Sequence, residues 1–136
     1  MAAPVGQKER AIPAPGVNPE TAAFWDAAKE GKFLIRSCDD CNRAHWYPRA
    51  ICPHCLSDKT KWQESKGRGT IYSVSVMLRA PEVYAIAYVT LDDGPTMMTN
   101  IVDCDYGTLA IGQKVQLTFK PTQGEGSPPY PMFKPA

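Results

Sequence analysis

The second half of the chain alternates apolar and polar residues with a period of two, a pattern typical of β-strands that bury one face. The longest alternating stretch is residues 70–79, and three more strands are predicted at residues 84–91, 95–102 and 114–120. The sequence Asp92-Asp93-Gly94 predicts a tight hairpin between the second and third strands.

A fifth strand around Trp62 completes a set that fits a small Greek-key barrel of the OB type, which we predict for residues 63–120. Closing the sheet into a barrel leaves few open edges. Residues 121–136 contain five prolines and are predicted to form a Pro-rich tail that is neither helix nor strand. Its apolar residues are interpreted as docking contacts; they are Tyr130, Met132 and Phe133.

Residues 1–31 are predicted to form an extended arm followed by an N-terminal helix. Asn18 suits the N-cap, Pro19 suits the first turn, and Gly31 suits the end of the helix. The helix carries Phe24 and Trp25 on a wide apolar face. Such a face packs either on its own domain or against another chain. With the barrel, these elements give a mainly β fold.

Two C-x2-C pairs, separated by ten residues, are the most specific signal in the sequence: Cys38 with Cys41, and Cys52 with Cys55. Two such turns on facing arms of a hairpin direct four thiolates at one tetrahedral Zn²⁺. They predict a rubredoxin-like zinc ribbon over residues 32–62. Four sulfur ligands leave no open coordination position, so the predicted Zn²⁺ is structural.

Other assignments of the metal site remain open at this point. Four thiolates also bind iron or an iron–sulfur cluster, which would make the chain an electron carrier. His45 and His54 are potential substitute ligands, but with four cysteines available we expect both to be ordinary loop residues. Cys104 has no partner in the sequence and is expected to be a core or edge thiol.

Composition and charge narrow the function classes. The chain has 136 residues, of which 43% are hydrophobic and 21% charged, and its formal net charge is +1. This near-neutral balance excludes binding of nucleic acid by bulk positive charge. The apolar runs are far shorter than the roughly 20 residues of a membrane span. The first residues lack the apolar core of a secretory signal, so we expect a cytoplasmic protein.

Residues 18–120 resemble a family of zinc-ribbon plus OB-fold proteins associated with acyl-CoA metabolism and long described as a domain of unknown function. All four metal positions of that family are cysteines here. The resemblance rests on five motifs in this order: Phe24-Trp25-Asp26-Ala27-Ala28-Lys29-Glu30-Gly31, Lys32-Phe33-Leu34-Ile35-Arg36-Ser37-Cys38, Trp46-Tyr47-Pro48-Arg49, Gly67-Arg68-Gly69-Thr70-Ile71-Tyr72-Ser73 and Ile111-Gly112-Gln113-Lys114-Val115.

The resemblance implies a non-catalytic accessory subunit in a hetero-oligomer with a thiolase-like enzyme, either an acyltransferase or an aldolase, that helps to bind or channel coenzyme A (CoA) thioesters. The chain shows no nucleophile–base pair or paired carboxylates of its own. CoA phosphates call for basic residues near turns and apolar surface. The candidates are Arg43, Arg49, Arg68 and Arg79.

Nucleic-acid binding is the alternative function, because OB barrels and zinc ribbons both perform it. It requires basic residues interleaved with exposed aromatic residues on one face of the barrel. The strands at residues 84–91 and 95–102 contain no charged residue, which argues against it.

Overall fold

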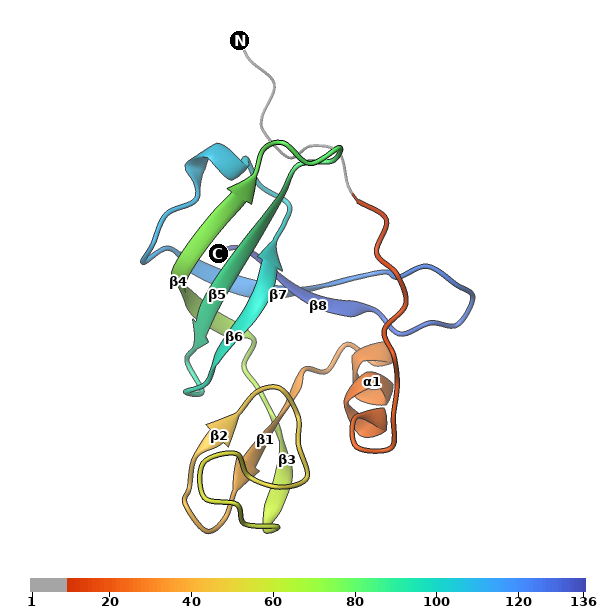
Figure 1. Cartoon of the computed structure of the whole chain (residues 1–136), viewed down its shortest axis with the longest axis vertical. Coiled ribbons are helices and arrows are strands. Elements are labelled where there is room, and N and C mark those ends of the chain that lie inside the picture. The colour runs from red at the N-terminus through yellow and green to blue at the C-terminus, as the bar shows by residue number, and fades with distance from the viewer. Residues whose placement is uncertain (1–9) are drawn as a thin grey trace.

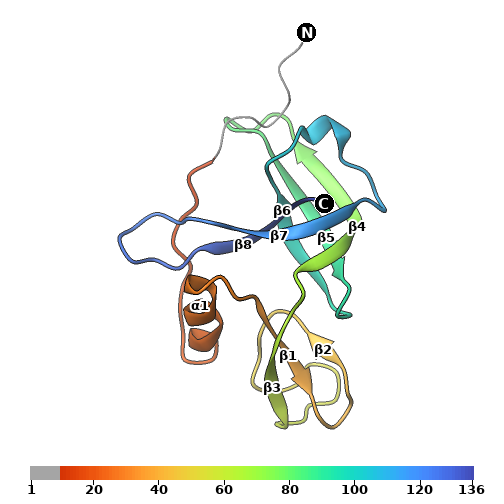
Figure 2. The same cartoon turned by 180° about the vertical axis from the view of Figure 1, so that it is seen from behind.

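A computed structural model describes residues 10–136, so the first nine residues of the predicted arm lie outside the described part. The ribbon lies below the barrel in Figure 1, and Figure 2 shows the same arrangement from behind. The elements are α1 (Ala22–Lys29), β1 (Leu34–Cys38), β2 (Ala44–His45), β3 (Thr60–Glu64), β4 (Arg68–Met77), β5 (Tyr84–Leu91), β6 (Thr96–Ile101), the 3-10 turn η1 (Tyr106–Thr108), β7 (Lys114–Lys120) and β8 (Tyr130–Pro135).

Helix α1 begins later than the sequence predicted. Asn18 caps a preceding turn instead of the helix, because its side-chain oxygen accepts a hydrogen bond from the N–H of Thr21 at 3.0 Å. Thr21 is the residue at the N-terminal end of the helix, and Gly31 lies just past its C-terminal end with φ 79°. Within residues 10–136, no helix is both long enough and apolar enough to cross a bilayer.

The ribbon is a three-stranded antiparallel sheet in the order β2-β1-β3. The strand around Trp62 belongs here and not to the barrel, which corrects the sequence prediction. Trp62 lies opposite Arg36 of β1, and the Arg36 guanidinium stacks over its ring at 4.5 Å. The barrel therefore takes its fifth strand from elsewhere in the chain.

The barrel is a closed five-stranded sheet in the order β4-β5-β6-β8-β7, with β4 paired to β7 to complete the ring. The fifth strand is β8, which lies in the segment predicted to be an irregular Pro-rich tail. β8 runs parallel to β6 and antiparallel to β7. The prediction that residues 121–136 form neither helix nor strand was therefore wrong, because they contain β8. The closed OB-type barrel is confirmed.

The prolines of β8 are compatible with a strand because of where they fall in the ladder. The N–H of Ala136 donates to the carbonyl of Lys114 at 3.1 Å. In an antiparallel pair, hydrogen-bonded positions alternate with non-hydrogen-bonded ones. Pro131 and Pro135 are an odd number of residues from Ala136, so their nitrogens do not face β7. The missing N–H groups cost the β7–β8 ladder nothing.

Aromatic side chains join the helix, the ribbon and the barrel into one hydrophobic core. Phe24 of α1 packs edge-on against Phe33 and Trp46, with ring centroids 6.1 and 5.0 Å apart. Phe33 in turn contacts Phe133 of β8 at 6.3 Å. Trp25 contacts the ring of Tyr130 at 5.5 Å. The apolar face of α1 therefore packs on its own chain. Of the aromatic residues of the predicted tail, Phe133 is fully buried, whereas Tyr130 packs against Trp25 and remains 39% exposed.

Ser65 fixes the junction between the ribbon and the barrel. Its N–H donates to the carbonyl of Phe33 at 2.8 Å, and its hydroxyl donates to a carboxylate oxygen of Asp93 at 2.5 Å. The same hydroxyl accepts the N–H of Gly67 at 3.1 Å. The linker between β3 and β4 is thereby held against the β5–β6 hairpin.

Replacing Phe133 with Ala tests whether β8 is a core strand. Phe133 is fully buried, so we expect the free energy of unfolding, measured with urea, to fall by about 3–5 kcal/mol. Leu78→Ala is the control, because Leu78 is 66% exposed, and it should change stability by less than about 0.5 kcal/mol. A loss below about 1 kcal/mol for Phe133→Ala would contradict the position of β8.

Candidate metal centre

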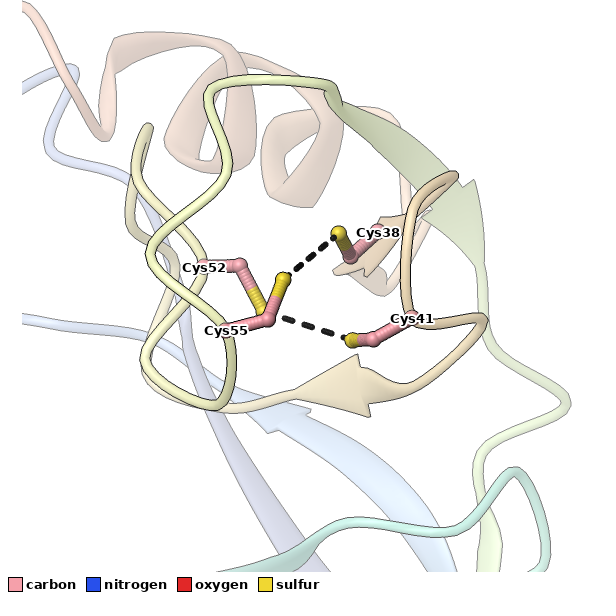
Figure 3. Close-up of side chains that lie close together, drawn as sticks. All are labelled: Cys38, Cys41, Cys52 and Cys55. Atoms are coloured by element: carbon pink, nitrogen blue, oxygen red, sulfur yellow. Dashed lines mark hydrogen bonds between the residues drawn. The ribbon is translucent and has the colours of Figure 1, made fainter.

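Four cysteine sulfurs converge at one end of the ribbon (Figure 3). Cys38 ends β1 and Cys41 lies in the turn that follows, whereas Cys52 and Cys55 lie in the loop between β2 and β3. The four Sγ atoms all lie within 4.8 Å of one another. Cys38 and Cys52 are buried, and Cys55 is at the surface. The spacing of two C-x2-C turns therefore gives the cluster that the sequence predicted.

The two cysteine turns have the same local geometry. The N–H that follows the second cysteine donates to the carbonyl of the first at 2.9 Å, from Asn42 to Cys38 and from Leu56 to Cys52. Asn42 and Leu56 both have positive φ, 58° and 67°. In both turns the N–H of the first cysteine donates to the carbonyl five residues later, at 3.0 and 2.9 Å. These bonds fold each turn back, so that both of its sulfurs point to the same side.

The sulfur spacing fits a tetrahedral metal ion. A Zn–S bond of about 2.3 Å places neighbouring sulfurs of a regular tetrahedron about 3.8 Å apart. Cys38 Sγ lies 3.6 Å from Cys55 Sγ, and Cys41 Sγ lies 3.7 Å from Cys52 Sγ. The backbone N–H of His54 also points at Cys52 Sγ, at 3.4 Å, as a donor to a thiolate does. The four residues are therefore positioned to hold one ion and to fill its coordination shell.

The proton affinities of the cysteines show why a cation suits this cluster. The backbone N–H of Cys41 lowers the pKa of Cys38 to about 7, even though burial opposes the shift. For Cys55 the N–H of Ser57 lowers the pKa, but burial and the three neighbouring sulfurs outweigh it and raise the pKa to about 12. Four adjacent thiols cannot all ionise without a compensating charge. A divalent ion supplies that charge.

Neither histidine belongs to the cluster, which among residues 10–136 consists of the four cysteines alone. His45 is not the loop residue that the sequence predicted: it is buried in β2, and its Nε2 lies 3.3 Å from the carbonyl oxygen of Arg49. His54 Nε2 lies 3.4 Å from the carbonyl oxygen of Ala44. Both rings therefore contact the backbone of the ribbon.

The four arginines proposed for CoA do not gather at one place. All four are exposed. Arg43 and Arg49 lie in the ribbon. Arg68 begins β4 and Arg79 follows its end, so they are separated by the length of a ten-residue strand, about 30 Å. A single CoA phosphate group can contact at most a subset of them.

Sequence reasoning missed a cavity of about 600 Å³ at the end of the barrel away from the ribbon. It lies where β5 begins and β6 and β7 end, and residues 10–12 form one wall. The connection between β6 and β7 contains only the short turn η1, which leaves this space open. Residues that line the cavity include Tyr84, Asn100, Cys104, Tyr106, Lys120 and Met132. Five separate segments of the chain line the cavity, so no local sequence motif indicates it.

The cavity wall combines apolar surface with paired charges. The guanidinium of Arg10 lies over the Tyr84 ring at 3.9 Å, and Lys120 Nζ contacts a carboxylate oxygen of Asp103 at 2.6 Å. Burial raises the pKa of the Cys104 thiol and of the Tyr106 hydroxyl. Both groups are therefore neutral hydrogen-bond donors at pH 7. Cys104 is half-buried, as expected for an edge thiol.

Two sequence families match the chain. The rubredoxin-like zinc ribbon domain of ChsH2 matches residues 25–60, and the C-terminal OB-fold domain of ChsH2 matches residues 62–120. Among solved structures, the chain is similar to one described as "Ltp2-ChsH2(DUF35) aldolase". The TM-score is 0.76 and the identity 30%, over 89% of this chain and 98% of that one.

Two curated relatives are similar over most of this chain. A DUF35 domain-containing scaffold protein of Methanocaldococcus jannaschii is 33% identical over 75% of this chain and 78% of its own length. A probable enoyl-CoA hydratase alpha subunit of Thermomonospora curvata is 32% identical over 96% of this chain. The aligned region spans only 42% of that subunit, so the hydratase subunit carries a large part that has no counterpart here.

Metal analysis of single-cysteine variants tests the centre. We expect one zinc per wild-type chain and a loss of tightly bound zinc in Cys52→Ser, because three thiolates hold the ion more weakly than four. Cys104→Ser is the matched control and should keep its zinc, since Cys104 lies outside the cluster. A folded wild-type preparation without bound metal, or with iron in place of zinc, would contradict the assignment.

Proposed function

The chain belongs to the DUF35 family of ChsH2-type proteins with a zinc ribbon and an OB fold, and from this premise we propose that it is a non-catalytic accessory subunit of a thiolase-like acyl-CoA enzyme. One observation carries the proposal: the similarity to the ChsH2 structure covers 98% of a chain that was solved as part of an aldolase. The M. jannaschii relative is likewise described as a scaffold protein.

The metal centre supports a structural role for the ribbon. If Zn²⁺ takes all four sulfurs, it has no position left for a substrate or a water molecule. Its contribution is then to hold the two cysteine turns together in a sheet of three short strands. Such a small unit buries little apolar surface and depends on the metal for stability.

The arrangement of the remaining reactive groups also supports an accessory role. Cys104 lies in the β6–β7 connection of the barrel, whereas both histidines of the sequence lie in the ribbon. A cysteine nucleophile requires an adjacent base to form its thiolate. Burial instead raises the pKa of Cys104 and keeps it protonated.

We further propose that the chain contributes to binding the CoA thioester through the cavity at the end of the barrel. A volume of about 600 Å³ lies within the usual range for ligand sites. The two basic side chains of the wall already have partners, since Arg10 lies over the Tyr84 ring and Lys120 pairs with Asp103. The cavity therefore suits the uncharged pantetheine arm or the acyl chain of the thioester better than the phosphates of CoA. Arg43, Arg49, Arg68 and Arg79 remain candidates for phosphate contacts outside it.

Co-expression with a thiolase-like acyl-CoA enzyme subunit tests the accessory role. We expect a stable hetero-oligomer by size-exclusion chromatography and light scattering. The isolated chain should show no turnover of acyl-CoA, and Cys104→Ala should leave the activity of the complex within a few-fold of wild type. A loss of about 10³-fold would instead identify Cys104 as a nucleophile.

Filling the cavity tests the CoA proposal. Cys104→Trp places a large ring in the cavity, so the KM of the complex for its acyl-CoA should rise at least about tenfold while the complex remains assembled. Cys104→Ala is the matched control, because it changes the same position without filling the space, and it should leave KM unchanged. Equal KM values for the two variants would place the thioester elsewhere.

A further inference from the structure

A β-bulge in β4 turns one aromatic side chain away from the barrel. Ile71 lies opposite Val89 of β5, but the next pair along the ladder is Ser73 with Tyr88. Tyr72 is the extra residue of the bulge and is 68% exposed, whereas Ile71 is fully buried. A β-bulge changes the direction of a side chain, and bulges are more frequent than average near functional sites. This bulge adds an aromatic ring to the outer face of the sheet.

The bulge aligns Tyr72 with two further exposed residues on neighbouring strands. Tyr88 of β5 lies opposite both Ser73 of β4 and Met98 of β6 in the register. Tyr88 is 47% exposed and Met98 is 61% exposed. Three large side chains therefore form a row across β4, β5 and β6, and we name this row, Tyr72, Tyr88 and Met98, the outer row.

The residues next to the outer row are uncharged, and charged side chains begin at the margins of this face. Because side chains alternate along a strand, the register identifies which residues share the outer face of β4, β5 and β6 with it. Most of them are uncharged: Thr70, Ser73, Ser75, Met77, Tyr84, Ile86, Thr90, Thr96 and Asn100. The charged groups lie at the margins: Arg68 begins β4, Lys114 Nζ donates to the hydroxyl of Thr70, and Arg10 lies over the Tyr84 ring. An apolar row with charged groups only at its margins is typical of a protein interface, which has an apolar centre and a polar rim.

The shape of the barrel limits how a partner can bind here. The sheet is closed, so it offers no free edge for an added strand, and contact must be made by side chains. Side chains of this size have an accessible surface area of roughly 150–250 Å² each. At their observed exposures, the three residues of the outer row together expose on the order of 300 Å². That is the centre of a standard interface, which covers about 800 Å² per partner.

Charge and shape together select one kind of occupant. Single-stranded nucleic acid would stack on the two tyrosines but requires a basic groove for its phosphates, and the strands β5 and β6 contain no basic residue. A second copy would bring two convex barrel walls together, which bury little area. An enzyme subunit whose surface is apolar and flat or concave matches both the apolar chemistry of the outer row and the convex shape of the barrel wall.

We propose that the outer row is the centre of the surface through which this chain docks on its enzyme subunit. The proposal rests on the proposed accessory function and adds to it the location and chemistry of the contact. The C-terminal segment, whose apolar residues the sequence analysis interpreted as docking contacts, is paired as β8 and packs through Phe133 within the chain. The apolar face of α1 also packs on its own chain.

A triple substitution tests the proposal in the complex obtained by co-expression. Tyr72→Ser, Tyr88→Ser and Met98→Ser together should weaken the complex at least about thirtyfold, because a few central residues dominate most interfaces. The matched control replaces three other exposed apolar residues, Val17, Leu56 and Ile111, with Ser. The control should change the affinity less than about threefold. Zinc content and thermal unfolding show whether both variants are folded.

Each alternative gives a different result. A complex that keeps its affinity in the folded triple variant overturns the docking surface and leaves the accessory function intact. A wild-type chain that forms no complex overturns the accessory function and the surface with it. The surface assignment is also overturned if the outer row proves necessary for self-association of the isolated chain, or for binding an oligo(dT) probe at physiological salt.

Discussion

The contact between Phe33 and Phe133 is the constraint on which the rest of the structure depends. Phe33 enters the ribbon just before β1, and Phe133 is the centre of β8, the strand that closes the barrel. Phe24 and Trp46 pack against Phe33 from the helix and the ribbon. Without this aromatic cluster, the ribbon would be joined to the barrel chiefly by the linker at Ser65. With it, the metal-binding end and the barrel share one core.

The elements that the sequence predicted well are those whose signals are local. The two C-x2-C turns were sufficient to bring four sulfurs together, because each turn closes through bonds within six residues. The strands β5 and β7 match their predicted limits. The apolar run of β5 ends at the Asp92-Asp93-Gly94 turn, and alternation defines β7 within a short window. The OB-type closure also followed, although one of its five strands was assigned to the wrong segment.

The errors arose where distant segments decide the structure. β8 contains Pro131 and Pro135, and composition alone argues against a strand there. Its stability comes from register: the prolines occupy positions that need no hydrogen bond to β7, and Phe133 fills the core. The bulge at Tyr72 is similarly invisible in the sequence, because alternation along β4 does not show which partner residue it skips. The cavity is lined by residues from five segments and has no sequence signature.

The docking surface and the cavity meet at the residues that belong to both. Tyr84 and Asn100 lie on the outer face of the sheet by their register, and both also line the cavity. Arg10 stacks on Tyr84 and marks the border between the two. A subunit seated on the outer row would therefore lie beside the cavity opening, so a thioester held there would sit next to the protein–protein interface. If the chain has the proposed accessory function, this geometry gives it a direct way to influence a reaction carried out by its enzyme subunit.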